Sequence, residues 1–168
     1  FKIDKRGDLL NSLYFVAKLP KLDRSFLEDN SDADGGDGWK LNYVRWVNYI
    51  GNVLIKKVRL YIGGDLIDEQ TGEFMQVYTD IQDDDWNKLC LIGMDSELNR
   101  PVETLNPRFV YVPLKFWFCA NIKKALPIIA MRHQDIEVEV DIRNWNECYQ
   151  VLQLWKFDND ISRRIKWF

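Results

Sequence analysis

Apolar and polar residues alternate along much of the chain, which is typical of strands that bury one face. The clearest case is Ile136–Ile142, where four aliphatic residues alternate with Glu137, Glu139 and Asp141. A second alternating segment, Leu9–Leu19, ends at a proline. Each pattern predicts a strand with one apolar face and one polar face.

The segment Arg108–Cys119 predicts a longer strand, in which alternate residues share one apolar face. Pro113 cannot donate a ladder hydrogen bond, so we expect an edge position or a bulge there. The run from Lys115 to Phe118 is apolar on both faces around Trp117, which favours burial in the core or beneath a neighbouring subunit. The residues expected on the shared face are Val110, Val112, Leu114, Phe116 and Phe118.

A hairpin is predicted where Val58–Ile62 runs into Gly63, Gly64 and Asp65. Two glycines adopt positive φ at little cost, so they suit a tight turn with Leu66–Glu69 as the returning strand.

One segment predicts a helix. Phe74, Val77, Tyr78 and Ile81 recur at helical spacing and form a single apolar stripe, of the kind that amphipathic helices turn towards a core. Thr71 is the expected N-cap, Glu73 would stabilise the first turn, and the helix should end before three consecutive aspartates at 83–85.

Several strands, one short helix and long loops predict an all-β fold, a β-sandwich with an inserted helix. The lack of alternating strands and helices argues against a Rossmann or barrel enzyme. Residues 28–38, which read EDNSDADGGDG, have no large apolar side chain and predict a surface loop.

Composition narrows the possible functions. The 168 residues are 46% hydrophobic and suffice for one domain with its own core. A formal charge of -3 argues against direct nucleic-acid binding. No apolar run approaches the roughly 20 residues of a membrane span, so we expect no membrane insertion.

Three separated cysteines predict reduced thiols in a cytosolic setting. Because Phe1 opens the chain and Trp167 and Phe168 close it, we expect a segment of a longer protein.

Candidate catalytic groups are few. His133 is the single histidine, which cannot supply a multi-histidine metal site, and no serine lies in a nucleophile-elbow motif. Glu137 and Glu139 share a strand face and are expected to be solvated rather than to form an acid–base pair. Residues 30–35 match the first half of a calcium loop, but Leu41 stands where a bidentate glutamate belongs. We therefore predict no catalytic, cofactor or metal site and no enzyme activity.

Two binding motifs have weak support. Arg6-Gly7-Asp8 spells the integrin tripeptide but leads directly into a predicted strand, where the glycine supplies a bend. The seven tryptophans could form a sugar-stacking platform, which leaves a carbohydrate-binding sandwich as an alternative function.

Several ordered motifs resemble the major capsid proteins of nucleocytoplasmic large DNA viruses. They lie in Arg6–Leu10, in Trp46–Gly64 with the hairpin and helix that follow, in Tyr111–Cys119, and in Ala125–Ile142. Together they span most of residues 1–142.

The resemblance implies a double jelly roll: two sandwiches per chain, assembled as homotrimers that tile an icosahedral shell. Residues 1–143 would form the N-terminal jelly roll, without its opening strand, and residues 144–168 the last strand and the link towards a second roll. The implied partners are copies of the chain, neighbouring capsomers and minor capsid proteins. Assembly in the host cytoplasm and location in the virion follow from the family, and a minor capsid role is a further alternative.

Overall fold

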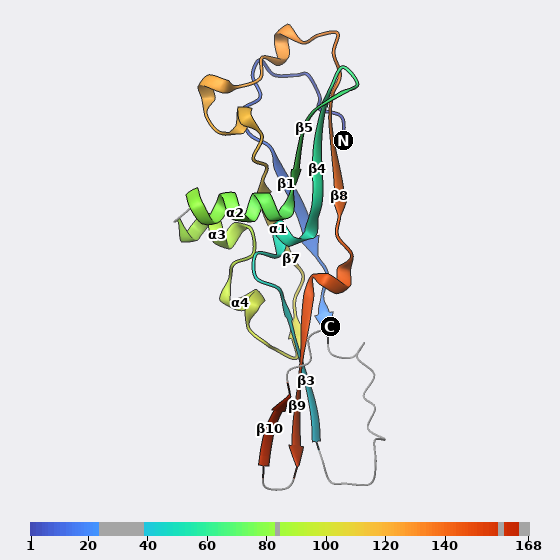
Figure 1. Ribbon diagram of the computed structural model, residues 1–168, viewed down its shortest axis with the longest axis vertical. Helices are drawn as coiled ribbons and strands as arrows, with labels where there is room; N and C mark the ends of the chain where they lie inside the picture. Colours follow the sequence, from blue (N-terminus) through green and yellow to red (C-terminus); the bar gives the residue numbers. More distant parts are fainter. Residues whose placement is uncertain (24–38, 83–84, 158–159, 165–168) are drawn as a thin grey trace.

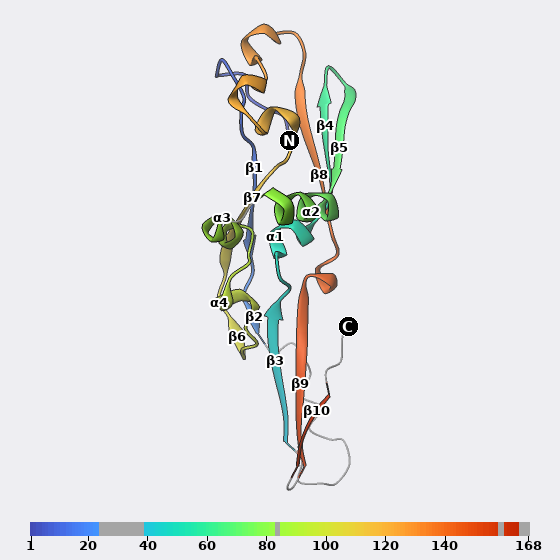
Figure 2. The same ribbon diagram turned by 60° about the vertical axis from the view of Figure 1, so that its left-hand side comes forward.

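The computed structural model describes residues 1–23, 39–82, 85–157 and 160–164. These residues form an elongated sandwich of antiparallel strands with short helices beside it (Figure 1). One layer contains β1 (Tyr14–Leu19) paired with β7 (Arg108–Pro113), and a short pair, β2 (Leu22–Asp23) with β6 (Thr104–Leu105), continues below it. In Figure 2 this layer faces the remaining strands across the core.

The facing layer contains two three-stranded sheets placed end to end along the long axis (Figure 2). In the upper sheet, β4 (Ile55–Ile62) lies between β5 (Asp65–Thr71) and β8 (Ile136–Ile142). The lower sheet has the order β10-β9-β3, with bounds Asp160–Arg164, Tyr149–Phe157 and Trp39–Trp46.

The two sheets are joined by a short interruption in one long antiparallel ribbon. On one side β3 continues into β4 through α1 (Ile50–Leu54), and on the other β8 continues into β9 through η5 (Trp145–Glu147). Hydrogen bonds bridge the gap, from the Val47 N–H to the Cys148 carbonyl at 3.1 Å and from the Arg143 N–H to the Leu54 carbonyl at 2.8 Å. The ribbon therefore runs the length of the molecule although its strand geometry is broken in the middle.

Two apolar clusters fill the space between the layers. The upper cluster joins β4 and β8 to β7 and to the segment that follows it, and includes Leu60, Val112, Phe116 and Ile136. The lower cluster joins β3 to β1, β2, β6 and β7. Because neighbouring residues of β7 enter different clusters, this strand ties the two halves together. The buried members of the lower cluster are Leu19, Leu22, Val44, Trp46, Ile50, Leu98, Leu105, Val110 and Cys148.

Three strand predictions are confirmed. β8 has the predicted bounds and buries Ile136 and Val138 while it exposes Glu137 and Glu139. The β4–β5 hairpin turns at Gly63 and Gly64, whose φ values of 64° and 93° are the positive angles that a two-residue hairpin loop requires. β1 ends at Leu19 as predicted.

Two strand boundaries are wrong. β1 begins at Tyr14 rather than Leu9, although Leu10 still forms an isolated bridge with Leu126. β7 ends at Pro113 rather than Cys119, since a proline cannot continue the donor ladder and the chain then turns into η2 (Trp117–Cys119). The five residues predicted to share the apolar face are nevertheless all buried.

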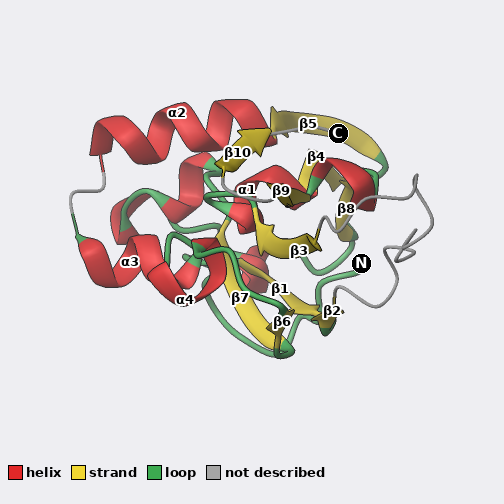
Figure 3. Ribbon diagram, turned by 90° about the horizontal axis from the view of Figure 1, so that it is seen from below, coloured by secondary structure: helices red, strands yellow, loops and turns green. Residues whose placement is uncertain are grey.

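The predicted helix is α2 (Gly72–Gln82), and the Phe74 N–H donates to the Thr71 hydroxyl oxygen at 3.2 Å, which confirms the N-cap. Three further helices were not predicted: α1, α3 (Trp86–Leu91) and α4 (Ser96–Asn99) (Figure 3). All are shorter than two turns, too short to show helical periodicity. The predicted loop 28–38, with its calcium-loop match at 30–35, lies outside the described residues.

Candidate assembly surfaces

The apolar stripe of α2 faces away from the core, whereas amphipathic helices usually turn such a stripe inward. Phe74, Val77 and Ile81 are 48%, 56% and 75% exposed. The face turned inward instead contains Gly72, Met75 and Thr79. The helix is therefore apolar on its outer side, where no described residue covers it.

Close packing at the start of α2 fixes this orientation. A Cβ at Gly72 would lie 2.2 Å from the Ile55 carbonyl oxygen and 2.4 Å from that of Asn52. Only glycine permits the backbone of α2 to approach α1 and β4 so closely. At the middle of the helix Met75 is fully buried, and the Thr79 hydroxyl donates to its carbonyl at 2.8 Å.

Arg143, which directly follows β8, also contacts the start of α2. Its guanidinium donates to the Val53 carbonyl at 3.0 Å and forms ion pairs with Glu73 and Glu147. A backbone hydrogen bond at the first turn and the Arg143 guanidinium lower the pKa of Glu73. The Glu73 carboxylate thus stays ionised, and through Arg143 it links α2 to Glu147 in η5.

The outer face of the β1–β7 pair is also apolar and exposed. Val16 lies opposite Tyr111, and Lys18 lies opposite Phe109 with its ammonium 5.8 Å from the ring centre. Tyr14 lies on the same face, and its side chain and those of Val16, Phe109 and Tyr111 are each about half exposed. The layer therefore presents an apolar surface both inward and outward.

The outer face of the β5-β4-β8 sheet is charged instead. Arg59 pairs with Glu69 at 2.7 Å, with Glu139 at 3.1 Å and with Asp141 at 3.0 Å. The Tyr61 hydroxyl donates to Glu139 at 3.1 Å, which raises the pKa of this phenol. The guanidinium offsets only part of the charge of these three carboxylates, and Glu137 and Glu139 are exposed, so the prediction of a solvated acidic face is confirmed.

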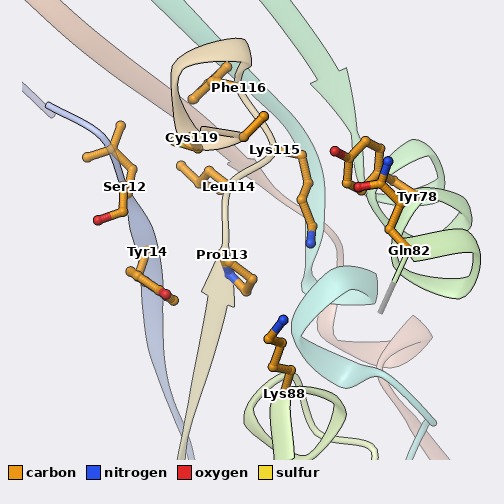
Figure 4. Close-up of a pocket in the computed structure, with 12 residues that line it drawn as sticks. Ser12, Tyr14, Tyr78, Gln82, Lys88, Pro113, Leu114, Lys115, Phe116 and Cys119 are labelled. Carbon is orange, nitrogen blue, oxygen red and sulfur yellow. The ribbon is translucent and has the colours of Figure 1, made fainter. Parts of the chain in front are cut away.

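One pocket lies between β1, the segment after β7, and α2 and α3 (Figure 4). It encloses about 240 Å³, and Lys88 and Lys115 extend into it from opposite sides. The Lys115 ammonium lies 5.2 Å from the centre of the Tyr78 ring. Cys119 also lines the pocket, but burial raises the pKa of its thiol, so the nucleophilic thiolate is disfavoured. No histidine or carboxylate among its described lining residues could act as a base.

The other candidate groups are dispersed. His133 is exposed in the turn before β8, as expected of an ordinary loop residue. Within the described ranges, no three histidine, cysteine, aspartate or glutamate residues come together as metal ligands, and no helix could span a bilayer. Arg6 pairs with Asp4 at 2.7 Å. Because β1 starts later than expected, the Arg6-Gly7-Asp8 triplet lies in the segment before it, where the chain bends at Gly7 and Asp8.

The tryptophans with described side chains have different environments. Trp46 is buried, whereas Trp86 and Trp145 are exposed, and Trp145 stacks on Tyr149 with ring centres 5.0 Å apart. Trp117 is 39% exposed, so it is not buried in the core of this chain, and its burial beneath a neighbouring subunit stays a prediction. The alternating residues around it do enter the core, but the outer face stays open.

A sandwich with paired surface charges, open apolar faces and no nucleophile–base pair among its described residues is typical of a domain that builds assemblies. Residues 1–163 match the family described as "Major capsid protein N-terminus". The chain therefore belongs to this family of structural capsid proteins, which confirms the resemblance stated above.

Individual relatives of the chain are also named as capsid proteins. The chain is 31% identical over 150 residues to "Probable capsid protein 4" of Acanthamoeba polyphaga mimivirus, an alignment that covers 89% of this chain and 28% of that protein. It is 28% identical over 172 residues to the major capsid protein of Phaeocystis pouchetii virus, covering 87% of this chain and 31% of the relative. The chain thus spans about a third of the length of these relatives.

Solved structures show the same fold at low sequence identity. VP54 of PBCV-1, fitted into a reconstruction of the virophage Sputnik, has a TM-score of 0.62 and 22% identity, over 92% of this chain and 36% of VP54. The Faustovirus major capsid protein has a TM-score of 0.53 and 14% identity, over 88% of this chain and 39% of that one. The predicted all-β jelly-roll class is confirmed.

Proposed function

We propose that the chain is the N-terminal jelly roll of a double jelly-roll capsid subunit, which forms homotrimers that tile an icosahedral shell. The observation that carries the proposal is the outward apolar face of α2, together with the open apolar face of β1–β7. Exposed apolar faces are unfavourable for a monomer in water, whereas in a shell they are buried against neighbouring subunits.

We propose the same division of the chain as the sequence predicts. Residues 1–143 would be the jelly roll without its opening strand, and residues 144–168 its last strand and the link to a second roll. The pairing of β9 with β3 over eight residue pairs, from Trp39–Lys156 to Trp46–Tyr149, supports a structural role for the later segment.

The role is structural rather than enzymatic. In the described pocket the thiol is disfavoured as a thiolate, and no base accompanies it. Further partners would be neighbouring capsomers and minor capsid proteins, with assembly in the host cytoplasm and final location in the virion.

The proposal is tested by measuring the mass of the protein expressed from its complete gene and by locating the protein in virions. Analytical ultracentrifugation should give three times the mass of one chain, and electron microscopy of purified virions should place the protein in the shell in many copies. A monomer that binds glycans tightly on an array, and is absent from the shell, would instead support a carbohydrate-binding module.

A further inference from the structure

The pocket between β1, α2 and α3 is a feature that the proposed shell role does not use (Figure 4). Its volume of about 240 Å³ lies below the roughly 300–1,000 Å³ that is usual for pockets of drug-sized ligands, so it suits a smaller molecule. Its described lining residues include two lysines, Lys88 and Lys115, and neither aspartate nor glutamate. The chemistry of the lining therefore favours a small anion.

The walls of the pocket are anchored independently of one another. On the side of β1, the Leu114 N–H donates to the Leu13 carbonyl at 2.9 Å. The Lys115 carbonyl accepts a hydrogen bond at 3.0 Å from the side-chain amide of Gln70, which is buried. On the opposite side, the side chain of Asp85 caps the start of α3. The two lysines are thus carried on fixed backbone, which lowers the cost of ordering them around a ligand.

The ammonium groups of the two lysines converge. Figure 4 shows that Lys115 extends from the segment after β7, and Lys88 from α3, towards the same space beside Pro113. The Lys115 ammonium lies 5.2 Å from the centre of the Tyr78 ring. Such a contact orients an ammonium group but adds no net negative charge, so Tyr78 positions this lysine without neutralising it.

Two ammonium groups match the charge of one phosphate group. A phosphate monoester carries a charge of about −1.5 to −2 at pH 7, and lysine binds phosphate as a point charge. The buried side chains of Leu114 and Phe116 form an apolar part of the lining, against which a short organic chain can lie. Since no histidine or carboxylate lines the described pocket, the chemistry supports binding of the ligand rather than its turnover.

We propose that the pocket binds the phosphate group of a small molecule, held between the ammonium groups of Lys88 and Lys115. The source of this group is either a phosphate monoester or free phosphate, which share the same chemistry. The inference does not depend on the proposed function, because the pocket lies within one chain.

A ligand at this site would also brace α2. Tyr78 and Gln82 line the pocket from this helix, whereas Phe74, Val77 and Ile81, here named the α2 face, are exposed on it. A phosphate group bound by α3 and by the segment after β7 would connect the elements beside the helix. Because the pocket exists only in the folded chain, the ligand should raise the thermal midpoint of unfolding.

Isothermal titration of the protein from its complete gene tests the site, with glycerol 3-phosphate and inorganic phosphate as separate probes. Lys88→Gln and Lys115→Gln should each weaken binding about tenfold, because each removes one of the two charges. The matched control Lys56→Gln removes the same charge from an exposed position on β4, and it should leave binding within about twofold. Tighter binding of the ester would identify a monoester as the ligand, and equal binding would identify free phosphate.

The pH dependence gives a second signature. The second pKa of a phosphate monoester is about 6, so binding should weaken several-fold between about pH 7.5 and about pH 5. Sulfate keeps its charge over this range, so its binding to the same pocket should not change. In addition, Tyr78→Leu should weaken phosphate binding about threefold, whereas Tyr78→Phe keeps the ring and should bind as the unaltered protein does.

Two results would overturn the proposal. One is the lack of any heat of binding, and of any rise in the thermal midpoint, with either phosphate probe at millimolar concentration. The other is equal binding by Lys56→Gln and by the two pocket variants, which would place the anion elsewhere on the protein. Neither result bears on the proposed function, which fails instead if the unaltered protein forms neither trimers nor shells.

Discussion

Two rows of apolar side chains differ in this molecule, because one is buried and the other is exposed to solvent. The row from Val110 to Phe118 is buried between the two layers, and Phe116 in its middle is fully enclosed. The α2 face is equally apolar in sequence, yet Ile81 is three-quarters exposed. Periodicity shows that a row of side chains shares a face, but not which way that face points.

The difference comes from what anchors each element. The first part of the row is fixed by pairing of β7 with β1, which places Val110 and Val112 between the layers, and the Leu114 N–H continues this contact by donating to the Leu13 carbonyl at 2.9 Å. The helix is fixed by Gly72 against two backbone carbonyls and by Met75 in the core, so its more apolar side is left outside. An apolar face that the fold leaves open is available for another subunit.

The largest difference in stability is expected when an aspartate is placed in the buried row and, for comparison, in the exposed row. Phe116→Asp should abolish folding, because an unpaired buried carboxylate costs several kcal/mol. Phe74→Asp on the α2 face should change the free energy of unfolding by no more than about 0.5 kcal/mol. Circular dichroism with urea titration compares them, and a stably folded Phe116→Asp variant would show that the buried row is misplaced.

The anchor of α2 can be tested next. Gly72→Ala should destabilise the fold by roughly 1–3 kcal/mol, because the new methyl group would overlap the carbonyls of Ile55 and Asn52 and neither can move freely. Gly7→Ala is the matched control, since no atom lies within 4 Å of its added Cβ. Equal thermal midpoints for the two variants would argue against the close contact at α2.

A smaller effect is expected from removing one side chain of the α2 face. Ile81→Ser should leave the free energy of unfolding within about 0.5 kcal/mol of the unaltered chain. The same change should weaken association of the complete protein by about 1 kcal/mol, because an apolar contact between subunits is lost. Sedimentation across a concentration series measures this loss, and unchanged association would place Ile81 outside any subunit contact.

The smallest effect concerns pH. Since folding lowers the pKa of Glu73 below its ordinary value of 4.5, the ionised carboxylate adds stability above that value, and this stability is lost as the pH falls through the folded pKa. Glu73 is largely exposed, so the loss should stay under about 1 kcal/mol. Glu73→Gln should therefore be less stable than the unaltered chain at pH 7 and equal to it near pH 2. An equal difference at both values would exclude the ion pair with Arg143 as the cause.

Local features of the fold could be predicted from the sequence. The alternation in Ile136–Ile142 and the turn at Gly63 and Gly64 depend on neighbouring residues alone, and both are confirmed. The N-cap at Thr71 depends on one side chain and one turn of helix, and it too is confirmed.

Features that depend on distant residues could not be predicted. The pairing of β3 with β9 joins segments more than 100 residues apart, and no local pattern marks it. The break at α1 buries Ile50 and Asn52, and no local pattern in the sequence marks it. The outward face of α2 escaped prediction for the same reason, since it depends on tertiary position.

The most direct test of the account is hydroxyl-radical labelling of the α2 face before and after assembly. The labelling rates of Phe74 and Ile81 should fall several-fold when the protein from its complete gene forms shells, whereas Leu66 at the β4–β5 hairpin serves as an exposed reference. Equal labelling of Phe74 and Ile81 in assembled and dissociated protein would contradict the claim that this apolar face is covered by another subunit.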